Sequence, residues 1–386
     1  MKIVNKLLAA LLGGIFVFSG LIKLNDPVGT EIKLEEYFEV FAHDQDLGLA
    51  SLSWLWETLA PYSLSLAIFL SVLEVVLGIN LIMQYRVSSQ LWFMLPLVIF
   101  FTFLTFYSAY FNKVTDCGCF GDAIKLTPWQ SFSKDVFLLL LVIWLLINRR
   151  QFTPVRYQRL ASVVSLLSVI GATFLGIYTY RNLPLLDFRP YHIGANIPKY
   201  MEPSDSLRYG ESFYLYKDRQ SGDKIKLSEE TFNKEWKKYR DTTQYEYLDY
   251  DKPLLNPEAQ ARITDYQVND RAGNNVTAQT FEGKKLLVII PEVEKTYIHA
   301  LDEINQLSRT LEQQNIQTIV LTATDGATFE TFRHQFQLAI LSYYFADKTV
   351  LKTMIRSNPG LIFLEDGTVI NKWHYNNIPG PSELRP

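Results

Sequence analysis

The chain of 386 residues contains two cysteines, and they stand two positions apart as Cys117-Gly118-Cys119. Thiols outside the cytoplasm tend to be oxidised. A disulfide between residues this close needs a tight turn, and Gly118 permits the backbone angles of such a turn. The small ring is expected to be strained, and strained, exposed disulfides are the labile and oxidising ones. The pair therefore indicates a redox-active dithiol.

Two other interpretations of the cysteine loop stay open. A metal site would use two thiolates and a carboxylate, but the loop has no His, so a closed site needs ligands from another chain. The loop is otherwise a structural turn with a passive disulfide or idle thiols. Neighbouring cations lower a thiol pKa and neighbouring carboxylates raise it. The charged neighbours are Lys113, Asp116, Asp122, Lys125 and Lys134.

Five apolar stretches precede the polar second half of the chain, and each approaches the 20 or so residues that a membrane helix needs. They cover residues 7–22, 62–83, 91–111, 129–147 and 160–178. The fourth begins with Thr127 as cap, Pro128 at the first helical position and Gln130 completing a capping box. The cysteine loop therefore lies directly before a helix N-terminus.

The basic residues of the short connections predict the orientation in the membrane. The connection after the fourth stretch has no acid and carries Arg149, Arg150, Arg156 and Arg159. Together with Lys2, Lys6 and Arg86 it places the N-terminus in the cytoplasm, and the acidic segment 25–60 lies outside. The cysteine loop and the C-terminal half are then extracytoplasmic, on a protein of the cytoplasmic (inner) membrane. A cleaved signal peptide in place of the first span would leave the loop on the same side.

Charged residues also occur inside the predicted spans. Glu74 is near the middle of the second span, where a carboxylate marks a paired or functional position. Lys23 is the obvious partner, but it lies about 10 Å nearer the outer face, so pairing requires offset or tilted helices. Otherwise Glu74 is a protonated carboxyl bonded to a hydroxyl, or part of a proton relay. Lys134 and Asp135 are expected to snorkel at the surface. Residues 30–42 are expected to form an amphipathic helix on the outer side, either on the membrane surface or, as is favoured, as a loop helix packed over the bundle.

Three segments together resemble a known family: residues 18–24 (FSGLIKL), residues 74–78 (EVVLG) and residues 117–121 (CGCFG). They resemble the DoxX-like superfamily and, within it, the methylamine utilisation protein MauE, over residues 1–148. The resemblance implies a four-helix membrane bundle in which Cys117 and Cys119 are the working thiols, with Gly118, Phe120 and Gly121 completing their loop. It also implies a role in maturing a disulfide-rich extracytoplasmic protein.

The rest of the chain divides into a basic loop with the fifth span (149–181), a β-rich linker region (182–262) and an α/β domain (263–386). In the linker region, residues 213–216 and 224–227 are predicted to form a hairpin, and residues 245–247 a further strand. The predicted order of the last domain is strands 266–268 and 285–290, helix 298–314, strand 318–322, a helix around 330–336, and a hairpin of 361–364 with 369–373.

This order resembles a thioredoxin-like domain of the TlpA type. Pro359 stands where that fold carries a cis-proline. After the strand that ends at Ile290, Pro291-Glu292-Val293-Glu294 replaces the Cys-x-x-Cys of the family. The domain therefore cannot exchange thiols, and it either binds a polypeptide near Pro359 or is structural.

The favoured hypothesis is a membrane thiol-disulfide or maturation factor that passes electrons to or from a partner protein or a quinone. The alternative is a non-enzymatic scaffold or accessory subunit of an envelope complex, with the redox-silent domain as docking module. A third hypothesis is transport or quinone binding around Glu74. The net charge of -3 and the absence of a basic stripe argue against a nucleic-acid partner.

Overall fold

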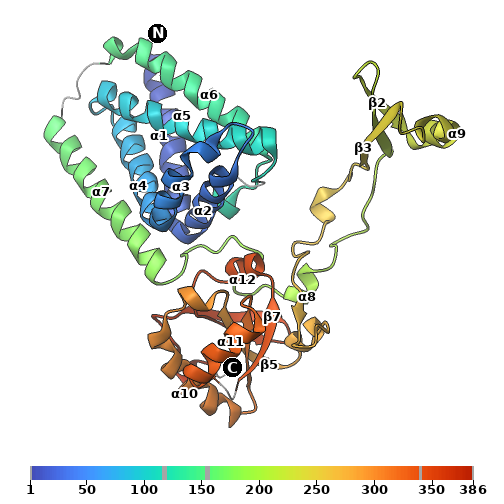
Figure 1. Ribbon diagram of the computed structural model, residues 1–386. Helices are drawn as coiled ribbons and strands as arrows, with labels where there is room; N and C mark the ends of the chain where they lie inside the picture. The colour runs from blue at the N-terminus through green and yellow to red at the C-terminus, as the bar shows by residue number, and fades with distance from the viewer. Residues whose placement is uncertain (1, 115–119, 153–156, 339–340, 385–386) are drawn as a thin grey trace.

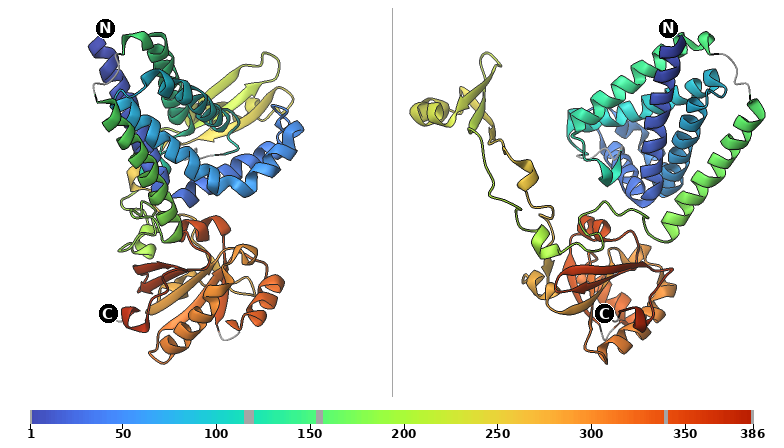
Figure 2. Two further views of the ribbon diagram at one scale, coloured as in Figure 1. Left: turned by 90° about the vertical axis from the view of Figure 1, so that its left-hand side faces the viewer. Right: turned by 180° about the vertical axis from the view of Figure 1, so that it is seen from behind.

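The computed structural model describes residues 2–114, 120–152, 157–338 and 341–384. These residues form a helical bundle, an α/β domain at one end of it, and an arm that projects from the α/β domain (Figures 1 and 2). The cysteine pair lies outside the described residues, so its conformation stays a prediction.

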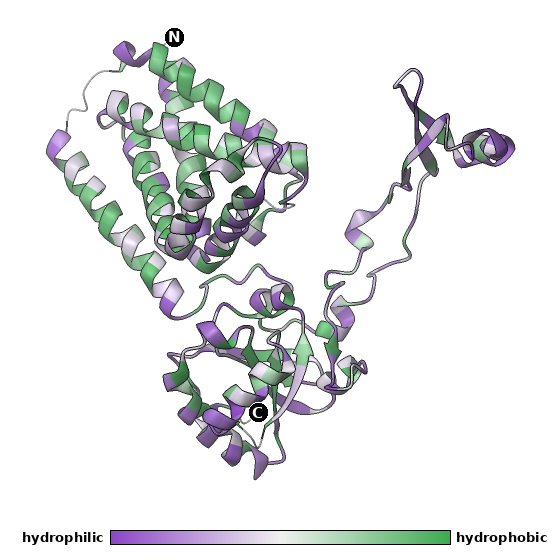
Figure 3. Ribbon diagram, in the orientation of Figure 1, coloured by the Kyte–Doolittle hydropathy of each residue, from purple (hydrophilic) through white to green (hydrophobic). Residues whose placement is uncertain are grey.

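Within the described ranges, five helical stretches are long and apolar enough to cross a membrane, which confirms five apolar helices in the first half. Their helices are α1 (Lys2–Asn25), α4 (Ser63–Ile82), α5 (Val87–Phe111), α6 (Pro128–Ile147) and α7 (Gln158–Arg181). Apolar residues dominate all five (Figure 3). The capping box of Thr127 and Gln130 at the start of α6 is present as expected.

Glycines allow helices α1 and α4 to approach each other closely. A Cβ atom on Gly13 would lie 2.6 Å from the carbonyl oxygen of Gly78, and one on Gly20 would lie 2.8 Å from that of Ser71. Helices α5 and α6 pack on this pair, and the shared core includes Leu12, Leu91 and Leu145. Helix α7 lies along α4 and is the least buried of the five.

Two short helices cover the end of the bundle nearest the α/β domain: α2 (Pro27–His43) and α3 (Ser53–Leu59). Asp26 caps α2 by accepting a hydrogen bond from the Gly29 amide at 2.9 Å. Helix α2 buries Leu34, Tyr37 and Phe41 against the bundle. A helix is therefore present at residues 30–42 as expected, and it packs over the bundle, which was the favoured interpretation.

The C-terminal domain is built on a six-stranded mixed sheet of order β4-β7-β6-β5-β8-β9. Strands β5, β6 and β7 are parallel, and the other pairings are antiparallel. The strands are β4 (Val268–Asn269), β5 (Lys284–Ile290), β6 (Gln317–Thr322), β7 (Ser342–Ala346), β8 (Gly360–Glu365) and β9 (Thr368–His374). The helices are α8 (Ile197–Tyr200), α10 (Leu301–Glu312), α11 (Gly326–Gln335) and α12 (Lys348–Met354). Helices α10 and α11 pack on one face, and α8 and α12 on the other.

Most elements expected in this domain are present, with three differences. The strand expected at 266–268 is displaced and has only two residues, because it pairs with just two positions of β7. Strand β7 and helix α12 were not predicted from the sequence. The Asn358–Pro359 peptide bond is cis, as expected.

The arm is a separate three-stranded antiparallel sheet of order β2-β1-β3. Its elements are β1 (Phe213–Asp218), β2 (Lys224–Ser228), α9 (Glu229–Tyr239) and β3 (Tyr245–Asp251). The predicted hairpin and the strand at 245–247 are confirmed, while helix α9 was not expected. An aromatic core that includes Tyr216, Tyr239 and Tyr245 holds the sheet to α9. The arm is joined to the α/β domain by two chain segments that run side by side (Figure 2).

Candidate functional site

The described residues next to the cysteines are seated on the bundle. Phe120 follows Cys119, and its ring lies 5.6 Å from that of Phe18 on α1. The ammonium group of Lys134 on α6 is 4.6 Å from the centre of the same ring. Gly121 adopts a positive φ of 51°, a conformation that favours glycine. These contacts anchor the loop where it returns to the bundle.

Lys23 and Glu74 form a buried ion pair with a distance of 2.5 Å between Nζ and Oε1. The Phe101 ring lies 4.1 Å from the Lys23 ammonium. A Cβ atom on Gly20 would lie 3.1 Å from Glu74 Cβ, and Lys23 stands about one turn, roughly 4.5 Å, further along α1. The offset expected from the sequence was therefore too large, and the Lys23 side chain reaches Glu74 from about one turn away.

A second ion pair lies beside the first. Lys134 Nζ is 3.0 Å from Asp135 Oδ1, and Thr105 donates a hydrogen bond to Asp135 Oδ2 at 3.0 Å. The Asp135 side chain is only 5% exposed. The expectation that both residues merely snorkel was wrong, because Asp135 faces α5 inside the bundle and holds Lys134 there.

The four charged residues line one small cavity of about 30 Å³ inside the bundle. Glu74 Oε2 is buried without a hydrogen-bond partner among the described residues. The cavity has the size and the polar lining to hold a water molecule. Two carboxylates and two ammonium groups in one cavity can donate and accept protons, and Lys134 brings this cluster into contact with Phe120. Charges at this depth are costly and are retained for function or pairing.

A second polar network holds Lys113, which precedes the cysteine loop. Lys113 contacts Asp44 at 2.9 Å and Asp46 at 2.6 Å, and Tyr107 donates a hydrogen bond to Asp44 at 2.7 Å. Burial alone would raise the pKa of Asp44, but the hydrogen bonds from Lys113, the Leu47 amide and Tyr107 outweigh it and lower that pKa to about 2. The Lys113 charge is therefore engaged by carboxylates, which argues against its use to lower a thiol pKa.

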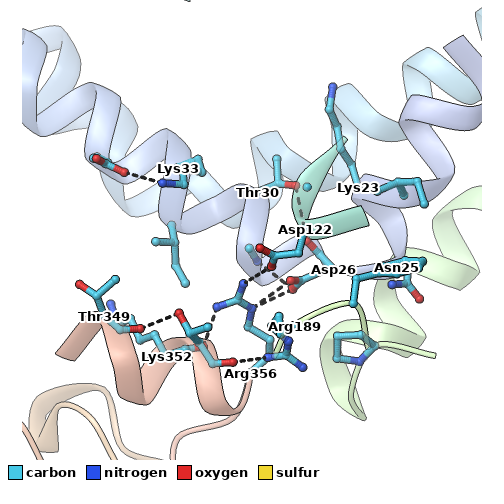
Figure 4. Close-up of a pocket in the computed structure, with 18 of the residues that line it drawn as sticks. Lys23, Asn25, Asp26, Thr30, Lys33, Asp122, Arg189, Thr349, Lys352 and Arg356 are labelled. Carbon is cyan, nitrogen blue, oxygen red and sulfur yellow. Dashed lines mark hydrogen bonds and ion pairs between the residues drawn. The ribbon is translucent and has the colours of Figure 1, made fainter. Parts of the chain in front are cut away.

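At the end of the bundle that faces the α/β domain, Arg356 joins the two. Its Nε lies 3.0 Å from Asp26 Oδ2, and its Nη2 lies 3.6 Å from Asp122 Oδ2, three residues after Cys119 (Figure 4). Burial would raise the pKa of Asp26, but Arg356 and Arg189 outweigh it and hold that pKa below its ordinary value. Arg356 was not among the predicted site residues, because nothing in the local sequence marks a partner 330 positions away.

Two cavities lie between the bundle and the α/β domain. The larger, of about 440 Å³, separates α2 from α12, and we call it the junction cleft. The smaller, of about 260 Å³, includes Glu31 and Glu35 of α2 opposite Lys295 and Asn358. Lys295 pairs with Glu35 at 3.1 Å. The surface beside Pro359, where a polypeptide was expected, therefore faces α2 of the same chain.

The segment of residues 291–294 that follows β5 is held by ion pairs and hydrogen bonds. Glu292 lies 2.7 Å from Lys348 and 2.8 Å from Lys352. Asn358 donates a hydrogen bond to the Glu292 carbonyl oxygen at 2.7 Å. Burial would raise the pKa of Glu292, and the two lysines lower it. These contacts make the segment a fixed structural element.

Docking of the α/β domain on α2 is expected to weaken as pH rises through about 7. Burial, then Glu35, raises the pKa of Glu31 from 4.5 to about 7, against the opposing effect of Lys295, Lys352 and Arg356. The docked state then binds more protons than the separated state between these values. The contribution of Glu31 to docking is therefore complete below pH 4.5 and is lost as the pH rises through about 7.

The measurement is the distance between spin labels on α2 and α12, at Glu39→Cys and Thr349→Cys, with Cys117 and Cys119 changed to serine. Between about pH 5 and pH 8 the docked fraction should fall. In Glu31→Gln the fall should be absent over the same interval. An equal fall in both proteins would rule out Glu31 as the titrating group.

Comparison with known proteins gives one match. The family model of methylamine utilisation protein MauE matches residues 1–148, which contain helices α1 to α6 and the cysteine loop. No curated protein and no solved structure is significantly similar to the chain. The first 148 residues are therefore similar to the MauE family, and this match together with the five apolar helices indicates a multi-pass membrane protein.

Proposed function

Because its first 148 residues form a MauE family domain, we propose that this protein is a membrane-bound maturation factor that acts on extracytoplasmic proteins by thiol-disulfide exchange at Cys117 and Cys119. The observation that carries the proposal is that both cysteines of the chain fall inside the matched domain. The seating of Phe120 on the buried charge cluster supports it, since the loop is then fixed at one end.

The proposed topology has the N-terminus in the cytoplasm and the α/β domain outside the inner membrane. Asn5 donates a hydrogen bond to Gln151 at 2.9 Å, so the N-terminus and the arginine-rich connection share one end of the bundle. The α/β domain contacts the opposite end through Asp26. This separation supports the orientation drawn from the basic residues.

The bundle is proposed to be DoxX-like and the C-terminal domain thioredoxin-like, of the TlpA type. Three parallel strands continued by the antiparallel pair β8 and β9 support the second assignment. Since this domain has no cysteine, its role is to cover the loop side of the bundle. A client dithiol would reduce the Cys117–Cys119 disulfide and leave as a disulfide. A quinone or an oxidised partner protein would then take up the two electrons and two protons.

The test is to trap the mixed disulfide in cells with Cys117→Ser and Cys119→Ser singly. One variant should accumulate a reducible covalent adduct with a client protein, while the double variant should form none and should leave the client immature. Alkylation should find the wild-type pair partly oxidised. If neither single variant captures a partner and the double variant matures clients normally, the proposal fails.

The second candidate is a membrane-anchored scaffold for an envelope complex. The observation that favours it is the fixed, cysteine-free Glu292 segment together with the projecting arm. A scaffold would keep its complex in the double Cys→Ser variant, whereas the favoured function predicts that covalent capture depends on the thiols.

A further inference from the structure

Residues from both halves of the chain line the junction cleft, together with Gly121 and Asp122, which follow the cysteine pair (Figure 4). Helix α2 forms one wall and helix α12 the other, and the linker after α7 closes one end. The residues that line these parts include Thr30 and Lys33 of α2, Thr349 and Lys352 of α12, Gly121 and Asp122 of the loop, and Leu186 and Phe188 of the linker.

The residues that line the cleft suit a ligand that has both polar and apolar groups. Its charges occur as opposed pairs, such as Lys33 with Glu36 at 3.1 Å and Arg356 with Asp26 at 3.0 Å. Such pairing leaves no concentrated positive field for a free phosphate group. Threonine hydroxyls and an apolar end suit amide groups and small side chains. An extended polypeptide segment has this combination of backbone polar groups and varied side chains.

Chain connectivity brings the cysteines to this cleft. Gly121 lines the cleft and stands two residues after Cys119. Two residues span no more than about 7 Å in any backbone conformation. A client cysteine seated beside Gly121 is therefore close enough in the chain to meet Cys119.

We propose that the junction cleft is the client site, and that it binds an extended, cysteine-containing segment of the polypeptide to be matured. This inference rests on the proposed function and adds the class of substrate and where it binds. A client thiolate attacks one sulfur of the Cys117–Cys119 disulfide, which breaks the bond and releases the other cysteine as thiolate. A second client thiolate attacks the resulting mixed disulfide. The client leaves as a disulfide, and the two electrons remain on Cys117 and Cys119.

The experiment uses the reduced full-length protein in lipid nanodiscs and two chromogenic substrates. One is a short unstructured peptide whose single cysteine carries thionitrobenzoate as a mixed disulfide, and the other is the small disulfide dithiobis(nitrobenzoate). Attack of the protein thiolate releases coloured thionitrobenzoate from either. Only the peptide needs the cleft, so the ratio of the two second-order rate constants reports its use.

Thr349→Trp narrows the cleft from an exposed position of α12. It should lower the rate constant for the peptide about tenfold or more, a loss of at least about 1.4 kcal/mol, and leave that for the small disulfide unchanged. Thr30→Trp on the opposite wall should do the same. The matched control Thr331→Trp, exposed on α11, should change neither.

Three results would overturn the inference. Equal effects on both substrates would mean that the thiols themselves are disturbed. An unchanged peptide rate, with loss of co-purified phospholipid in Thr349→Trp, would assign the cleft to a lipid headgroup. An unchanged peptide rate without that loss would leave the cleft with no part in the reaction. A wild-type protein that reacts with neither substrate beyond the double Cys→Ser variant would instead contradict the proposed function itself.

Discussion

Lys23→Met should destabilise the membrane bundle by about 3–5 kcal/mol, the usual cost of leaving a buried charge without its partner. The Glu74 side chain is 3% exposed, and its Oε2 has no other partner among the described residues. The measurement is the unfolding of the purified protein in mixed micelles, followed by circular dichroism. Loss of the pair should also loosen the cavity under Phe120 and reduce client trapping.

Two variants decide whether the ion pair is the cause. In Lys23→Met with Glu74→Gln both charges are gone, so most of the lost stability should return. Lys6→Met removes a lysine of the same helix near its terminus and should change stability by less than about 0.5 kcal/mol. A double variant as unstable as the single one would mean that Lys23 acts through packing instead.

Arg356→Glu should separate the α/β domain from the bundle. It replaces the cation that contacts Asp26 and Asp122 with a third carboxylate. Removing one partner of a buried, hydrogen-bonded charge pair costs roughly 2–5 kcal/mol, and the Arg356 side chain is only 9% exposed. The other ion pair across the junction among the described residues, between Lys295 and Glu35, is more exposed and should contribute little to docking.

The spin-label distance between α2 and α12 measures this separation directly. In Arg356→Glu it should lengthen and broaden, whereas Arg309→Glu on the exposed face of α10 should leave it unchanged. Arg356→Lys keeps the charge without the fork geometry and should give an intermediate result. A short, narrow distance in Arg356→Glu would show that other contacts dominate the docking.

Features that depend on local sequence were predicted well. A membrane helix needs only a long apolar run, so all five stretches appear as helices, and α1 is several residues longer than expected. The capping box at Thr127 depends only on three neighbouring residues. The hairpins likewise follow from alternation and turn residues. Helix α12 was missed because seven residues are too few to show a helical pattern.

The candidate site was likewise predictable only where residue types and short spacings were sufficient. The sequence by itself determined that two cysteines stand together before a capped helix, and that Glu74 needs a partner, since both statements concern residue types and short spacings. Only the tertiary structure decided that Lys23 pairs with Glu74, that Asp135 holds Lys134 inside the bundle, and that Arg356 reaches Asp26 across 330 positions. These contacts depend on how closely the helices approach and on how the α/β domain docks, and no local pattern encodes either.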